Sequence, residues 1–147
     1  MEIMEYSDTE KLLRECDAGS KMAVTSIDEV IDNVKDEGMK QLLNESKDHH
    51  SKLGNEIHSL LNQHDTDEKD PNPMAKGMSW MKTNMKMSMN GSDAVVADLI
   101  TDGCNMGVKS LNRYLNQYKN ADQTSKGICE KLVSIEEQLC KDLRKYL

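Results

Sequence analysis

The hydrophobic residues of this chain recur every three or four positions along four stretches, with polar residues between them. This spacing is typical of amphipathic helices that bury one face. The longest stretch covers residues 36–64, and the others cover residues 8–34, 93–118 and 123–147. Because few β-branched runs interrupt the pattern, the sequence predicts an all-α fold.

The polar residues between these stretches predict where the helices begin and end. Ser7 and Glu10 have the S-x-x-E spacing of a capping box, so the first helix should begin near residue 8. Ser92 or Asp93 should cap the third long helix. Residues 64–73 are polar and contain both prolines of the chain, which predicts a loop.

These boundaries divide a single domain into a helical hairpin (8–64), a crossover with a short helix (65–92) and a second hairpin (93–147). Short polar turns join the helices within each hairpin, so these neighbours should run antiparallel. The two halves also resemble each other in pattern, and His50 of the first corresponds to Glu136 of the second. The prediction is a four-helix bundle with one long crossover, which is the ferritin-like arrangement.

Composition and charge narrow the classes of partner. The chain has 147 residues and a net charge of -7, so it lacks the basic excess that nucleic-acid binding requires. No apolar run approaches the length of a membrane span, and the first residues do not have the pattern of a secretory signal. We therefore expect a cytoplasmic protein with no nucleic-acid or membrane partner. Homo-oligomerisation stays open at this point, and the sequence indicates no specific protein partner.

Cysteine spacing gives no support to a zinc or disulfide framework. The four cysteines are far apart, and each falls inside a predicted helix: Cys16, Cys104, Cys129 and Cys140. Isolated thiols on helices are typical of reduced core residues.

The longest stretch carries all four histidines, and two polar residues fall on its hydrophobic face. These are Ser46 and His50, while Glu136 lies on the core face of the last stretch. If His50 and Glu136 meet, each would shift the pKa of the other toward the charged form, while burial would oppose that shift. A buried pair that fixes helix register is favoured, and a reduced metal site or a proton-handling pair is the alternative.

The remaining histidines give one weaker metal candidate. Glu45 and His49 are one helical turn apart and could hold a single divalent ion near the surface. His58 and His64 have no partner close in sequence and are predicted to be surface residues. Helical angles place Asp17 off the hydrophobic face of the first helix.

The crossover is rich in methionine, and its spacing allows two interpretations. The M-x-M pattern at residues 85–89 suits a cuprous ion, because thioethers are soft ligands. Packing into a groove of the bundle is favoured, however, because one face of the predicted short helix is formed by Met74, Met78, Met81 and Met85.

Three short segments make the chain resemble the ferritin-like superfamily, and within it a bacterial branch of two helical hairpins without a settled activity. They are Cys16-Asp17-Ala18-Gly19, Trp80-Met81-Lys82 and Tyr114-Leu115. Di-iron members of that superfamily place a glutamate on each of two helices and a Glu-x-x-His pair on each of the others. This chain contains no Glu-x-x-His pair, so the resemblance implies the fold without an intact ferroxidase centre.

Together these features predict a ferritin-like bundle that is not an enzyme and needs no cofactor. The first alternative is a member that binds iron or another divalent ion, or acts as an oxidoreductase, at a sparse site around His50 and Glu136. The second is a partner-binding module whose Met-rich crossover exposes an apolar groove.

Overall fold

The computed structural model describes residues 5–68 and 92–147, and in these ranges it is all-α, with four long helices and no strand. The long helices are α1 (Asp8–Val30), α2 (Glu37–Gln63), α4 (Asp93–Gln117) and α5 (Gln123–Leu143). The 3-10 turns η1 (Ile31–Asn33) and η2 (Arg144–Tyr146) follow α1 and α5. The expected Met-rich helix and its copper alternative lie outside the described residues.

The helices begin where cap chemistry predicts. At α1 the Ser7 hydroxyl accepts from the Glu10 N–H at 3.2 Å, and the Ser7 N–H donates to the Glu10 carboxylate at 3.2 Å, which is a complete capping box. At each of the other three long helices, an N-cap side chain accepts one hydrogen bond from a first-turn N–H group: Asp36 for α2, Ser92 for α4 and Asp122 for α5.

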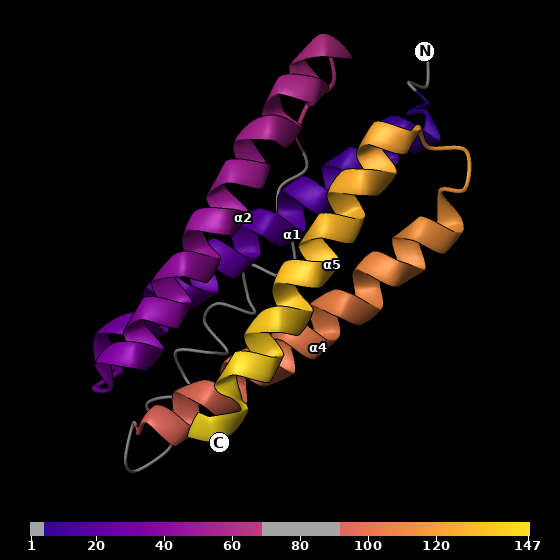
Figure 1. Ribbon diagram of the computed structural model, residues 1–147. Helices are drawn as coiled ribbons and strands as arrows, with labels where there is room; N and C mark the ends of the chain where they lie inside the picture. The colour runs from indigo at the N-terminus through magenta and orange to yellow at the C-terminus, as the bar shows by residue number, and fades with distance from the viewer. Residues whose placement is uncertain (1–4, 69–91) are drawn as a thin grey trace.

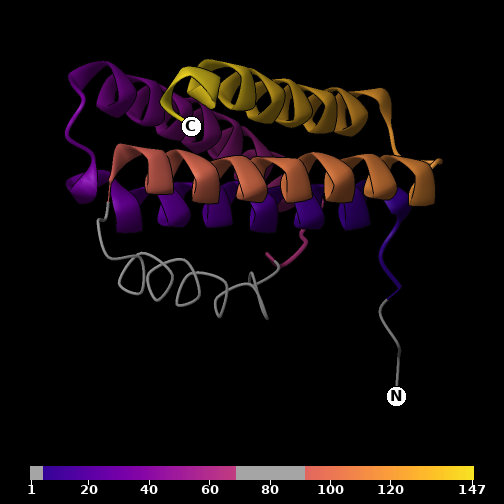
Figure 2. The same ribbon diagram turned by 90° about the horizontal axis from the view of Figure 1, so that it is seen from below.

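The four long helices form two layers. Figure 2 shows α1 beside α4 in one layer and α2 beside α5 in the other. Between the layers, α1 packs along α2 and α4 packs along α5 (Figure 1). No helix in the described ranges is long and apolar enough to span a membrane.

The core is divided into two hydrophobic clusters by a polar layer. One cluster joins the end of α1 to the start of α2, and includes Ile27 and Leu43. The other joins the start of α1 to the end of α2, and includes Leu12 and Ile57. Between them lie the buried polar residues Ser20, Ser46, His50 and Glu136. The burial of Ser46, His50 and Glu136 was predicted from their positions on the helical stripes.

Each helical pair also binds the connection of the other pair. The Asp93 carboxylate, in the first turn of α4, accepts from the N–H groups of Lys35 and Asp36 at 2.8 and 3.0 Å. In the first turn of α1, the Asp8 carboxylate and the Thr9 hydroxyl accept from the N–H groups of residues 120 and 122. The contacts are therefore reciprocal: α4 binds the connection between α1 and α2, and α1 binds the connection between α4 and α5.

Beyond α2 the chain turns back along α1. Asp65 has a φ of 52°, a left-handed conformation that aspartate tolerates better than most residues, and the Thr66 N–H donates to the Leu61 carbonyl. The Thr66 hydroxyl then contacts Glu10, and the Asp67 carbonyl accepts from the Arg14 guanidinium at 3.0 Å. This path brings Glu68 to the middle of α1.

Candidate metal centre

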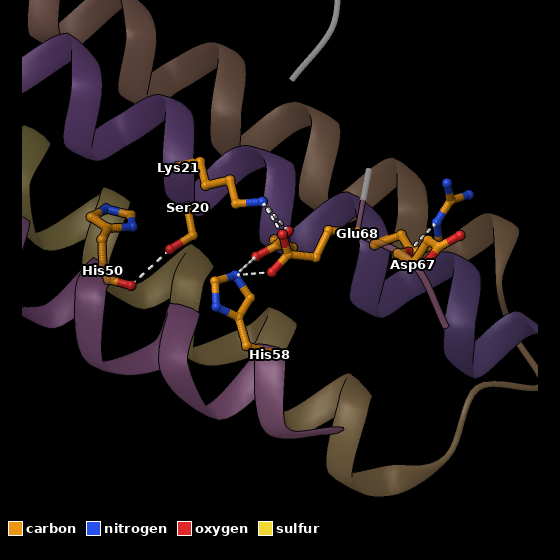
Figure 3. Close-up of polar contacts among 8 residues, drawn as sticks. Ser20, Lys21, His50, His58, Asp67 and Glu68 are labelled. Atoms are coloured by element: carbon orange, nitrogen blue, oxygen red, sulfur yellow. Dashed lines mark hydrogen bonds and ion pairs between the residues drawn. The ribbon is translucent and has the colours of Figure 1, made fainter. Parts of the chain in front are cut away.

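Three potential metal ligands from separate parts of the chain meet beside α1: Asp17 of α1, His58 of α2 and Glu68 of the segment after α2. The Nε2 atom of His58 lies 2.6 Å from Oδ1 of Asp17 and 2.9 Å from Oε1 of Glu68. Figure 3 shows the His58 ring pointing at the Glu68 carboxylate, with Lys21 on the other side of that carboxylate. The Lys21 ammonium lies 2.8 Å from Oδ2 of Asp17 and 3.1 Å from Oε2 of Glu68.

A close approach of α1 and α2 positions two of these ligands. The Ser20 hydroxyl donates to the His50 carbonyl at 2.7 Å, and a Cβ atom on Gly54 would lie 3.4 Å from the Ser20 hydroxyl oxygen. Asp17 is almost one turn before Ser20 in α1, and His58 is one turn after Gly54 in α2. The small contact at Ser20 and Gly54 therefore places the imidazole against the carboxylate.

Asp17 is the unusual member of the cluster, because its carboxylate is fully buried at 0% exposure. Burying an ionised carboxylate is costly unless a cation compensates it. Lys21 supplies part of that compensation. Burial opposes the charge of Lys21, but its close contacts with the carboxylates of Asp17 and Glu68 outweigh this and raise its pKa. Contact with Lys21 likewise lowers the pKa of Glu68.

The geometry around His58 does not fit ordinary hydrogen bonds. Although two carboxylate oxygens lie within 3 Å of Nε2, the ring N–H is not aligned with either of them. Within the described ranges, neither oxygen of Asp17 accepts a well-aligned hydrogen bond. One imidazole nitrogen and two carboxylate oxygens are, in contrast, a common donor set for transition-metal ions and zinc.

His50 and Glu136 lie close together in the structure, with Nε2 of His50 3.5 Å from Oε1 of Glu136. Burial, followed by the charge of nearby His49, lowers the pKa of His50 to about 4. Burial raises the pKa of Glu136 to about 7, although a hydrogen bond with Cys104 acts against it. Burial therefore outweighs the mutual attraction, and the pair tends toward its neutral forms.

Glu45 and His49, the other predicted metal candidates, are both exposed on α2. The Glu45 carboxylate accepts from the Gln41 side chain at 3.1 Å. Among the described residues, the cluster of Asp17, His58 and Glu68 is the one group of three or more ligands close enough to share an ion, and it includes neither Glu45 nor His49.

His58, predicted to be a surface residue without a partner close in sequence, is 37% exposed and contacts two carboxylates that are distant in sequence. The sequence-based placement of Asp17 away from the buried side of its helix was wrong. Asp17 is buried, because α1 has a second buried stripe toward α2 that includes Leu13, Asp17 and Ser20. The i, i+4 spacing of Asp17 and Lys21 was a signal for this stripe, but nothing local links either residue to His58 or Glu68.

Comparison with protein-family models and with curated proteins finds no match to this chain.

Proposed function

We propose that this chain is a metal-binding helical bundle that holds one divalent ion between Asp17, His58 and Glu68. The observation that carries the proposal is the fully buried Asp17 carboxylate, which faces an imidazole nitrogen and a second carboxylate without well-aligned hydrogen bonds. A single proton on Nε2 can serve only one oxygen well, whereas a metal ion would bind all three donors. Three protein ligands also leave coordination positions for water.

We further propose that the bundle is ferritin-like, with two antiparallel hairpins joined by the crossover. The pairing of α1 with α2 and of α4 with α5 supports this arrangement, as does the reciprocal binding of the two connections by Asp93 and Asp8. The pair His50 and Glu136, for which a metal site was the alternative, is assigned the structural role in fixing helix register that the sequence pattern favoured. It offers two ligands, and the neutral forms favoured by burial suit a hydrogen bond.

Titration of the purified full chain with Zn²⁺ and Co²⁺ tests the metal site directly. We expect one ion per chain, and a gain in unfolding free energy of about 3 kcal/mol when the free ion is at 100 times its Kd. Removing a ligand in His58→Ala, or the ligand charge in Asp17→Asn, should weaken binding by at least about tenfold. Isothermal calorimetry and thermal unfolding measure the two effects.

His49→Ala is the matched control, because it removes an exposed histidine from the same helix. Its affinity should equal that of the unchanged chain. If His58→Ala, Asp17→Asn and His49→Ala all bind metal with the affinity of the unchanged chain, the metal binds elsewhere and the proposed site is contradicted. A loss confined to His49→Ala would instead favour the surface pair of Glu45 and His49.

A further inference from the structure

The two carboxylates of the proposed metal centre are divided evenly between two nitrogen atoms. Asp17 presents Oδ1 to His58 at 2.6 Å and Oδ2 to Lys21 at 2.8 Å. Glu68 presents Oε1 to His58 at 2.9 Å and Oε2 to Lys21 at 3.1 Å. The ammonium therefore occupies one oxygen of each carboxylate, and the other oxygen of each faces the imidazole.

This division lets Lys21 remain in place when an ion binds. Lys21 and Asp17 are one turn apart on α1, so their contact does not depend on how α1 and α2 approach each other. We call Oδ1 of Asp17 and Oε1 of Glu68, which face His58, the inner oxygens, and Oδ2 of Asp17 and Oε2 of Glu68, which face Lys21, the outer oxygens. An ion bound at Nε2 would replace the proton between the ring and the inner oxygens. The outer oxygens would stay in contact with the Lys21 ammonium. Groups that orient the ligands of a metal in this way have strong effects on its binding.

On the basis of the proposed function, we infer that Lys21 is a positioning residue that holds Asp17 and Glu68 as single-oxygen ligands, so that the site selects a small ion of the Zn²⁺, Co²⁺ or Fe²⁺ class over Ca²⁺. Ca²⁺ needs six to eight oxygen ligands, which proteins often supply through bidentate carboxylates. Zn²⁺ accepts four ligands and binds imidazole well.

The donor atoms lie closer together than they would around a bound small ion. Donors placed around an ion at the zinc bond length of about 2.0–2.1 Å are separated by roughly 3.0–3.4 Å. The nitrogen-to-oxygen distances of 2.6 and 2.9 Å are slightly shorter, and all three donor atoms lie within 4.8 Å of one another. A modest widening of the cluster would therefore admit the ion.

Lys21 could affect metal binding through its charge or through the way it orients the carboxylates. Experiment can separate these two effects, because Zn²⁺ and Ca²⁺ carry the same charge. Removal of the Lys21 ammonium should change the attraction for both ions by a similar factor, so the ratio of their Kd values reports geometry alone. In Lys21→Met the outer oxygens become free to bind metal. We expect the preference for Zn²⁺ over Ca²⁺ to fall by about tenfold.

Lys47→Met is the matched control, because Lys47 makes a comparable ion pair with Asp28 at 2.8 Å outside the cluster. It should leave both Kd values unchanged. The visible spectrum of bound Co²⁺ gives a second readout, and Lys21→Met should shift it toward the weak absorption of higher coordination. Lys21→Arg keeps two donors for the outer oxygens, so it should retain the preference for Zn²⁺ over Ca²⁺. This variant also tests the inference if Lys21→Met fails to fold.

The outcomes distinguish this inference from the proposed function. If the unchanged chain binds Zn²⁺ with a dependence on His58, but Lys21→Met shifts both Kd values equally, Lys21 acts through its charge and the inference is wrong while the metal site stands. A preference of the unchanged chain for Ca²⁺ would also overturn it. If neither ion binds with a dependence on His58, the proposed function itself fails.

Discussion

His50 and Glu136 show how burial can outweigh the attraction between a potential acid and base. They lie 3.5 Å apart in the middle of the bundle, yet the pKa of His50 falls to about 4 and that of Glu136 rises to about 7. Both shifts favour the neutral form, because charge is poorly solvated among packed helices. Around neutral pH His50 is therefore neutral, and Glu136 is only partly ionised.

These shifts have opposite effects on stability in an overlapping pH range. Between about pH 4 and 6.5 the unfolded chain binds more protons at His50 than the folded chain does, so folding weakens as pH falls. Between about pH 4.5 and 7 the folded chain holds more protons at Glu136, so folding weakens as pH rises. In the unchanged protein the two slopes largely offset each other.

Single substitutions should reveal separately how each residue makes the free energy of unfolding depend on pH. Glu136→Gln leaves only the His50 effect, so this variant should lose on the order of 3 kcal/mol, relative to the unchanged chain, as pH falls from about 6.5 to 4. His50→Gln should instead lose stability as pH rises from about 4.5 to 7. Urea unfolding at a series of pH values measures the pH dependence of both variants. His49→Ala is the control for the effect of the His49 charge on His50. Parallel pH profiles in all variants would contradict the opposed shifts.

The helical connections are held by side chains from the first turns of distant helices. Asp93 of α4 binds two backbone N–H groups of the connection between α1 and α2, and α1 binds the connection between α4 and α5 through Asp8 and Thr9. These backbone groups have no partner within their own helices, so the contacts satisfy donors while fixing where each pair lies. Side chains in the first turns of α1 and α4 thus make tertiary contacts as well as local ones.

Asp93→Ala should lower the free energy of unfolding by about 1 kcal/mol, because it removes the acceptor of two exposed hydrogen bonds. Asp98→Ala is the matched control, since Asp98 is an exposed aspartate on the same helix. It should change stability by no more than about 0.5 kcal/mol. Urea unfolding compares the two, and an equal loss in both variants would assign the effect to charge rather than to the connection.

The bundle as a whole has two hydrophobic clusters with a polar layer between them. Each cluster draws on all four long helices, so neither can form from one pair alone. The layer of Ser20, Ser46, His50 and Glu136 interrupts the apolar packing between the two clusters. The two clusters should therefore contribute to stability independently of each other.

Substitutions in different clusters test this independence. Ile27→Val and Ile57→Val shorten buried isoleucines in the first and second clusters, and each should cost about 1 kcal/mol. In the double variant the losses should add to within about 0.5 kcal/mol. Ile27→Val with Ile100→Val, both in the first cluster, is the comparison in which coupling is expected. Larger coupling across the layer than within the cluster would contradict the division.

The sequence by itself determined the helices and much of their buried faces. Helical periodicity and cap chemistry act within a few residues, so α1, α2, α4 and α5 and the caps Ser7 and Ser92 could be predicted. The same periodicity predicted the burial of His50 and Glu136. Their shared depth followed from the matching pattern of the two halves.

Only the tertiary structure decided the candidate metal centre. Asp17 is buried because α1 has a second covered side, His58 reaches it because Ser20 and Gly54 let α1 and α2 approach, and Glu68 arrives after the turn at Asp65. Helical angles describe one helix at a time, so they cannot show which side another segment covers. The convergence of three ligands depends on distances between helices, and these are set by packing.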